Sequence, residues 1–320
     1  MWRNNSQLER QITKSVLNSM CLLVCIFGLA GNGAVVFFLG FRIKKNKFTI
    51  YILNLALADF IFLLFTSFVM TLDQHHDQDI ILKILLPVLL LSLFGYNASL
   101  YLLTAISMER CLSVLYPIWY QCRRPKHQSA VVCSLLWLLS CLMTAGEIFI
   151  CDKREYFSVG EDFPIHNKWC NAIYFSIGFL NFFVFTPLMV LSSVTLLIKV
   201  KRNSWKRQPS KLYVVIVATV ILFLIFALPI RVMLQVEYKY RILLPMIFVD
   251  MSSLLCSINS SVNPFVYWFV GHQGGGKTSF QMILHRIFRE DMKEDTHQHL
   301  QEIPDSSVVD TKVPKVEDSM

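Results

Sequence analysis

The sequence predicts an all-α membrane protein: a bundle of seven spanning helices with a short amphipathic helix after the last span. Charged residues make up only 16% of the 320 residues, whereas soluble domains contain about 25%. Apolar segments recur along the chain, and about 20 apolar residues suffice for one helical span. The connections are short, so the chain forms one bundle without a second domain. The seven segments are Ser15–Phe41, Phe48–Leu72, Ile80–Leu115, Gln128–Ile150, Trp169–Ile198, Leu212–Gln235 and Leu243–Val270.

Basic residues predict the orientation of this bundle. The connections at 42–47, 123–126 and 199–211 are rich in Lys and Arg, whereas those at 73–79 and 152–162 are mixed or acidic. Basic loops of multi-pass proteins face the cytoplasm, which places the N-terminus outside and the C-terminus inside. Such loops usually face anionic lipid, so they indicate topology in the bilayer and not a nucleic-acid partner.

The first two spans carry polar residues at membrane depth. Residues 1–14 form a predicted extracellular tail with one glycosylation sequon at Asn4. In the first span, Asn32 lies between two glycines, which permits close helix packing with a hydrogen bond across the interface. In the second span, the Asp59 carboxylate requires a proton, a cation or polar partners.

The third and fourth spans carry acidic residues near their ends. The third ends in Glu109 and Arg110, an acid–base pair at a membrane boundary that indicates function. The alternative is two snorkelling side chains that only mark the helix end. The fourth span has Trp137 in its middle and Glu147 near its outer end.

The last three spans contain prolines. Pro187 interrupts an aromatic-rich fifth span, and in the sixth Pro229 precedes Arg231, which we expect to be buried. The seventh contains Asp250 and Pro264. Kinks at such prolines are tolerated because Ser, Asn or water can satisfy the freed carbonyl groups.

The chain beyond the seventh span has two predicted parts. Apolar residues recur at helical spacing within 271–290, which is typical of a helix lying on the inner leaflet. Residues 291–320 are charged and lack aromatic side chains, so we expect them to be disordered. Residues 271–278 match the phosphate-loop pattern, but that motif needs a preceding strand in an α/β core, and here a membrane span precedes it.

The spacing of several short motifs is specific when they are taken together. With seven spans and an external N-terminus, the chain resembles the rhodopsin-like (class A) G-protein-coupled receptors from Ser15 to Phe288. The motifs are Asn32, Leu55-Ala56-Leu57-Ala58-Asp59, Glu109-Arg110-Cys111, Trp137, Pro187, Pro229 and Asn263-Pro264-Phe265-Val266-Tyr267.

Two departures from that pattern narrow the resemblance. The third span lacks the usual Cys at its outer end, and the sixth has Phe226-Ala227-Leu228-Pro229 in place of Cys-Trp-x-Pro. Together with Tyr267-Trp268-Phe269-Val270-Gly271, these features resemble the Mas-related receptors. That subfamily bridges its fourth and fifth helices instead, which matches Cys151 and Cys170, the two cysteines that flank an extracellular connection. The resemblance implies a plasma-membrane receptor for an extracellular peptide or small molecule, with heterotrimeric G proteins and arrestin as candidate partners.

The resemblance also implies a sodium site as the one candidate cofactor position. A buried carboxylate ringed by neutral oxygens suits a small hard cation. The alternative is a protonated Asp59 in a water-filled network. The matching positions are Asp59, Ser99, Asn259, Ser260 and Asn263.

For the ligand, the sequence favours a cationic molecule. An acid near the outer end of the fourth helix, Glu147, can attract a cation. Mas-related receptors that bind basic ligands pair such a Glu with an Asp in the fifth helix, where this chain has Tyr174. Arg231 is expected to pair internally with Glu147 or Asp250, or else to meet an anionic group of the ligand.

At the cytoplasmic face, the resemblance assigns coupling to Glu109, Arg110 and Tyr267, with Arg110 as the G-protein contact. Residues 199–211 contain no Asp or Glu, so we expect no ionic restraint of Arg110 from the sixth helix and measurable ligand-free signalling.

The rival function is a membrane transporter or channel. Transporters usually show internal repeats and a polar path to both sides; this sequence shows no repeat, and seven helices do not divide into halves. An enzyme is not expected, because charged residues within the spans are scattered, without nucleophile–base or metal-ligand spacing.

Overall fold

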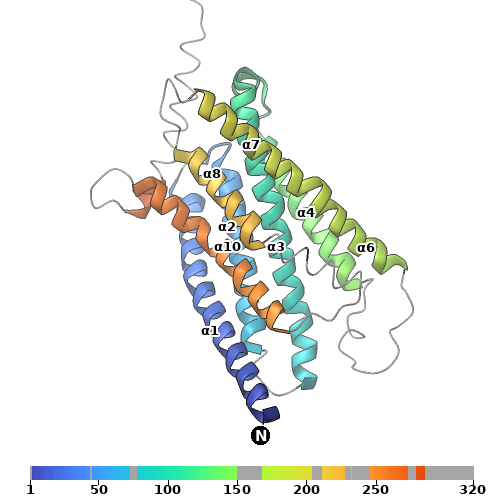
Figure 1. Ribbon diagram of the computed structural model, residues 1–320. Helices are drawn as coiled ribbons and strands as arrows, with labels where there is room; N and C mark the ends of the chain where they lie inside the picture. Colours follow the sequence, from blue (N-terminus) through green and yellow to red (C-terminus); the bar gives the residue numbers. More distant parts are fainter. Residues whose placement is uncertain are drawn as a thin grey trace, which may run out of the picture.

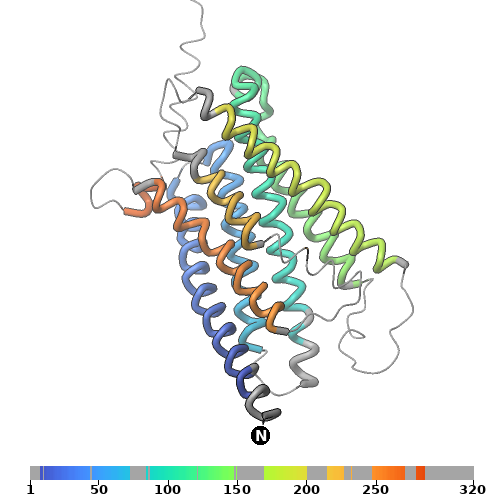
Figure 2. Tube along the Cα trace, in the orientation of Figure 1, coloured from blue at the N-terminus to red at the C-terminus, as the bar shows by residue number. Residues whose placement is uncertain are grey.

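Helices make up nearly all of the computed structural model, which describes residues 2–43, 45–72, 78–149, 168–203, 211–227, 232, 246–272 and 279–284. They pack into one elongated bundle (Figure 1). Helices α1 (Trp2–Phe37) and α10 (Met246–His272) lie side by side along one edge, and α4 (Gln128–Phe149) and α6 (Lys168–Phe179) lie along another (Figure 2). Within these described ranges no residue belongs to a strand.

Each of the seven predicted spans contains a described helix. The second is α2 (Thr49–Leu72) and the third is α3 (Gln78–Leu115). Several helices continue into, or are joined by, wider π-helical turns. These turns are η1 (Phe38–Arg42) after α1, η2 (Trp119–Arg123) before α4, η3 (Leu180–Phe185) between α6 and α7 (Thr186–Asn203), and η4 (Phe223–Ala227) after α8 (Lys211–Leu222).

The outer surface of the spans is apolar, as expected for a surface that faces lipid. Side chains on the outside are large and apolar, such as Phe27 and Phe183, whereas Asn, Ser, Asp and Glu side chains are buried. Soluble proteins show the reverse preference for charged and amide side chains. Among the described residues, five helical stretches are long and apolar enough to cross a membrane, and a shorter apolar helix, Val215–Phe226, lies in the sixth predicted span. The five are Gln11–Arg42, Thr49–Leu72, Pro87–Leu115, Gln128–Glu147 and Trp169–Lys199.

The first helix is longer than predicted. It begins at Trp2, so the described residues of the predicted tail 1–14 form a helix continuous with the first span, and Asn4 of the sequon lies in its first turn.

A wide turn precedes the proline of the fifth span. Proline has no N–H to donate, and its ring clashes with the carbonyl group four residues earlier, here Phe183. The π-helical turn η3 contains Phe183 and ends just before Thr186 and Pro187, so its wider spacing accommodates the ring. In the sixth span η4 ends at Ala227; Pro229 and Arg231 lie outside the described residues.

Small residues set the distance between helices. A Cβ added to Gly95 of α3 would lie 2.6 Å from the backbone nitrogen of Phe62 in α2, so only glycine allows this approach. A Cβ at Gly31 would lie 3.1 Å from Pro264 of α10. Beside Gly31, the Asn32 amide donates to the Gly28 and Ser260 carbonyl oxygens, both at 3.0 Å, and this confirms the predicted hydrogen bond across the interface.

After the seventh span in the sequence, only residues 279–284 of the predicted amphipathic helix are described. Phe280 packs against Phe38 with ring centroids 6.0 Å apart, and Ile283 and Leu284 are fully buried. The residues before the phosphate-loop match form helix α10 and not the strand that this motif requires. Residues 291–320, predicted to be disordered, lie outside the described residues.

Candidate functional site

The buried carboxylate of Asp59 lies where α2, α3 and α10 meet. Ser99 Oγ of α3 donates to Asp59 Oδ1 at 2.5 Å, and Asn263 Nδ2 of α10 donates to Oδ2 at 2.7 Å. The Ser260 hydroxyl lies near this carboxylate, and Asn259 is buried beside Ser260. The structure thus brings Asp59, Ser99 and Asn263 of the predicted cation site into contact.

All these partners of Asp59 are neutral. Asp59 is 1% exposed, and no basic side chain of the described chain forms an ion pair with it. A charged carboxylate away from water needs compensation. The hydroxyl and amide oxygens around it are the ligand types that a small hard cation prefers, so the residues present fit a sodium ion.

Tyr267 and Trp137 occupy structural positions between the helices. Tyr267 is buried one turn beyond Asn263 on α10, between the Asp59 site and the end of the bundle that carries Lys47, Arg110 and Arg124, hereafter the basic end. Trp137 Nε1 donates to Asn54 Oδ1 at 2.9 Å and so ties α4 to α2.

At the basic end, the neighbours Glu109 and Arg110 make contacts in different directions. Glu109 Oε1 accepts hydrogen bonds from Tyr51 Oη and Arg124 Nη2, both at 2.9 Å. The Arg110 guanidinium lies over the Phe48 ring, 3.5 Å from its centroid. Consecutive residues of a helix do not face each other, which explains the divergence. Arg110 therefore contacts Phe48 on another segment of the chain, while the expectation of no ionic restraint from the sixth helix stays a prediction, because residues 204–210 lie outside the described residues.

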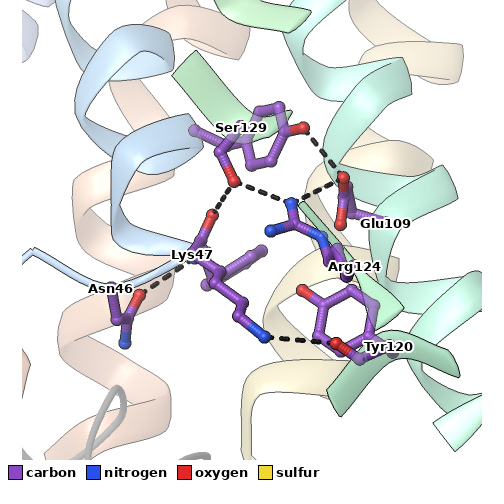
Figure 3. A network of polar contacts seen from close by, with 8 residues as sticks. Asn46, Lys47, Glu109, Tyr120, Arg124 and Ser129 are labelled. Carbon is purple, nitrogen blue, oxygen red and sulfur yellow. Dashed lines mark hydrogen bonds and ion pairs between the residues drawn. The ribbon is translucent and has the colours of Figure 1, made fainter. Parts of the chain in front are cut away.

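Arg124 is the residue that sequence reasoning missed. Its Nη2 forms an ion pair with Glu109 Oε1 and also donates to Ser129 Oγ at 2.7 Å. Ser129 in turn donates to the Lys47 carbonyl oxygen at 2.6 Å, and Lys47 Nζ donates to the Tyr120 carbonyl oxygen at 3.1 Å. Figure 3 shows this network joining three segments of the chain.

Glu109 stabilises the positive charge of the Arg124 guanidinium. Burial alone would lower the pKa of its guanidinium, but the hydrogen bond and the negative charge of Glu109 outweigh burial and raise that pKa above its ordinary value. Arg124 therefore stays charged, and the pair with Glu109 is ionic.

The position of Phe48 depends on the start of α2. Asn46 Oδ1 accepts from the backbone nitrogens of Phe48 at 3.0 Å and Thr49 at 2.6 Å, and Thr49 Oγ1 accepts from the Asn46 nitrogen at 2.8 Å. Such reciprocal capping fixes the chain as it enters a helix. The segment that carries Lys47 and Phe48 is thereby held against α3.

The opposite end carries the predicted ligand residues. Glu147 of α4 is 3% exposed, and its Oε2 has no hydrogen-bond partner within the described part of the chain. α4 approaches α6 here: a Cβ on Gly146 would lie 3.1 Å from Ile173 Cδ1, next to the half-buried Tyr174. The predicted partner Arg231 lies outside the described residues, so the choice between an internal pair and a free acid stays open.

Asp250 and the cysteines complete this end. Asp250 is half-buried at the start of α10 and lies close enough to Cys21 of α1 for an electrostatic interaction. Two turns further along α10, Ser257 Oγ lies 3.5 Å from the Cys21 sulfur. Asp250 therefore belongs to the part of α10 that packs on α1. Cys170 is disulfide-bonded, and its predicted partner Cys151 lies outside the described residues.

Comparison with known proteins decides the family. A family profile described as 7 transmembrane receptor (rhodopsin family) matches residues 31–267. The chain belongs to this family. It is 46% identical over 290 residues to the proto-oncogene Mas of Homo sapiens, covering 89% of this chain and 86% of that protein.

Two further relatives place the receptor within the family. It is 45% identical over 286 residues to the Mas-related G-protein coupled receptor member H of Rattus norvegicus, covering 88% of this chain and 86% of the relative. It is 38% identical over 283 residues to member D of Homo sapiens, covering 86% of each. The receptor is therefore a Mas-related, class A G-protein-coupled receptor of the plasma membrane and not an enzyme, and the predicted seven-helix fold is confirmed.

Proposed function

We propose that this receptor binds an extracellular cationic peptide or small molecule at the Glu147 end and activates heterotrimeric G proteins at the basic end. The proposal places the N-terminus outside and the C-terminus in the cytoplasm, because Lys and Arg are concentrated in the loops of the basic end. The two ends lie at opposite ends of α4, so the ligand and the G protein would act on a common set of helices.

The buried carboxylate of Glu147 is the main support for a cationic ligand. A carboxylate that is almost fully buried and has an oxygen without a hydrogen-bond partner is costly unless a cation or a proton compensates it. Thr144, one turn deeper on α4, is also buried and its hydroxyl has no partner among the described residues. These two groups offer a ligand one charged and one neutral polar contact.

The test compares potency with surface level. Cells expressing Glu147→Gln are screened for calcium and cyclic-nucleotide responses to cationic peptides. We expect the potency of an active peptide to fall by roughly ten- to hundredfold, or about 1.4 to 2.8 kcal/mol. Ser140→Ala is the matched control, since it changes a buried polar group on the same helix, outside the proposed ligand site, without changing charge.

Two other outcomes have definite meanings. If Arg231 already neutralises Glu147, the substitution leaves Arg231 unpaired and lowers surface expression instead of potency. Unchanged potency at normal surface level would exclude both interpretations and leave the acid without a role in recognition.

For the G protein, the basic end offers a buried cation and exposed apolar side chains. Arg110 is 2% exposed, so a partner can reach it only after it leaves Phe48. In the loop that follows α3, Ile118 is 67% exposed and Tyr116 is 59% exposed. Apolar side chains at the aqueous end of a bundle indicate a surface that a partner covers, and the G protein is the proposed partner, with arrestin as a second protein for the same surface.

The Asp59 site is proposed to hold a sodium ion. The supporting observation is the ring of neutral donors and oxygens around a buried carboxylate. When bound, the ion would supply the positive charge that the described partners of Asp59 lack. No other cofactor is proposed.

A further inference from the structure

The loop between α3 and α4 is fastened to the bundle at two points. One is the hydrogen bond from Lys47 Nζ to the Tyr120 carbonyl oxygen. The other is the Glu109–Arg124 ion pair at 2.9 Å, in which the Arg124 side chain is fully buried and the Glu109 side chain is 7% exposed. Only the second point involves a charge on α3, and it lies next to Arg110.

The Arg124 contact also joins a third segment. Arg124 Nη2 is shared between Glu109 and Ser129 Oγ, and Ser129 donates to the Lys47 carbonyl oxygen before α2. Figure 3 shows Arg124 at the centre of these contacts. Because one guanidinium bonds both to α3 and to the start of α4, and Ser129 continues the contact to the segment before α2, its release would detach α3 from the other two segments.

In this arrangement the Arg110 side chain is not accessible to a partner protein. While Glu109 faces Arg124, Arg110 lies on Phe48 and is almost fully buried. Contacts made in one state and not in another shift the equilibrium toward the first. The sequence 199–211 carries no Asp or Glu, and among the described residues the Glu109–Arg124 pair is an ionic contact at this end.

We propose that Arg124 acts as a latch: its ion pair with Glu109 fastens the loop onto α3 in the uncoupled state, and G-protein engagement requires the pair to open. The inference rests on the proposed function for its signalling consequence. The fastening itself can be measured without a G protein.

The decisive comparison is between two neighbouring arginines. Arg124→Gln removes the latch, whereas Arg123→Gln removes the same charge from an exposed position that takes no part in the network. Purified receptors in nanodiscs are mixed with a panel of heterotrimeric G proteins, and ligand-free nucleotide exchange is measured per receptor. We expect Arg124→Gln to raise exchange about five- to tenfold over the unsubstituted receptor, within the range of allosteric coupling, and Arg123→Gln to leave it unchanged.

Two graded variants separate a latch from a general loss of structure. Arg124→Lys keeps the charge but loses the planar fork, so its exchange should lie between the unsubstituted receptor and Arg124→Gln. Ser129→Ala keeps the ion pair and removes the neutral contact, so its rise should be smaller. Equal exchange for Arg124→Gln and Arg123→Gln would overturn the latch.

Arg124→Gln leaves Glu109 buried without its counter-ion, so this variant risks poor folding. The double variant Glu109→Gln/Arg124→Gln removes both charges and keeps two amides of similar shape. It should restore surface level while exchange stays raised. Exchange at the unsubstituted level in a well-folded double variant would count against the proposal.

Hydrogen exchange of residues 116–127, measured without a G protein, tests the Arg124 latch separately from the proposed receptor function. Faster amide exchange in Arg124→Gln than in Arg123→Gln establishes the fastening. If the loop loosens but no receptor activates any G protein above empty nanodiscs, the proposed function fails and the coupling half of the inference fails with it. If the receptors are active and loop exchange is equal in the two variants, the inference alone is wrong.

Discussion

Asp59 and Glu109 are both buried carboxylates at junctions between helices, yet they are compensated differently. Asp59 accepts hydrogen bonds from the neutral groups of Ser99 and Asn263. Glu109 accepts one hydrogen bond from Tyr51 and forms an ion pair with Arg124. Neutral donors lower the free-energy cost of burying a carboxylate but do not balance its negative charge. The positive charge of an arginine does balance it.

This difference implies different responses to the surroundings. Asp59 still attracts a cation or a proton from outside, so occupancy of its site depends on the medium. Glu109 is already neutralised by a group of the chain itself, so its state depends on where the loop between α3 and α4 lies. One carboxylate is suited to sense an ion, and the other is suited to sense a conformation.

The largest expected difference is in stability: replacing Glu109 by an amide should lower the free energy of unfolding more than replacing Asp59 by an amide. Glu109→Gln leaves Arg124 buried without a counter-ion and should lower the free energy of unfolding by about 3–5 kcal/mol. Asp59→Asn leaves no unpaired charge and should cost less than about 1.5 kcal/mol. Denaturant titration of the purified receptors in mixed micelles without sodium measures both values. Equal losses would show that the two sites are compensated alike.

Removing one neutral donor should matter at Asp59. Ser99→Ala deletes the hydrogen bond to Oδ1, and hydrogen bonds to charged groups contribute about 1.5–3 kcal/mol. Ser140→Ala is the control: Ser140 is buried in α4 but donates to the neutral Phe94 carbonyl oxygen, so a smaller loss is expected from the same unfolding titration. A loss no greater than the control's would mean that Asp59 is uncharged in this receptor.

Sodium should stabilise the receptor through Asp59 alone. At a sodium concentration about ten times its Kd, the stabilisation is about 1.4 kcal/mol, measured as a rise in melting temperature when sodium replaces choline. Asp59→Asn should abolish this rise and Glu109→Gln should retain it. A rise that survives in Asp59→Asn would exclude the site as the place where sodium acts.

Tyr51→Phe should have the smallest effect. It removes one hydrogen bond from Glu109, but Arg124 still compensates the charge, so the loss should be about 0.5–1.5 kcal/mol, as for an ordinary hydrogen bond. The same titration applies. If Tyr51→Phe costs as much as Glu109→Gln, then Tyr51 and not Arg124 is the main partner of the carboxylate.

The helices and the Asp59 site were predictable because both follow from local pattern. Long apolar segments fix the spans, and a carboxylate in such a segment needs polar partners wherever they come from. The partners Ser99 and Asn263 were found through the resemblance to class A receptors. The structure adds which oxygen each of them contacts.

The basic end was predicted incompletely, for a geometric reason. Glu109 and Arg110 are adjacent in the sequence, which suggests a pair, but consecutive helical residues point apart. Arg124 was counted only among the loop charges that set orientation, since a loop arginine is normally solvated. No local pattern shows that the loop folds back and buries it, although Pro125 marks a turn directly after it.

The wide turns η3 and η4 have a consequence for how the fifth and sixth spans can move. η3 lies within the fifth span and η4 ends the described part of the sixth at Ala227, and each holds an additional residue relative to the α-helical ladder. Such a turn can travel along a helix by exchanging one hydrogen-bonding partner for the next. Each step rotates the residue it passes by about 100°, the angle per residue of an α-helix. Tyr174 and Pro187 lie on opposite sides of η3, so the half of the fifth span that carries Tyr174 can turn about its own axis while the half beyond Pro187 keeps its packing against α3.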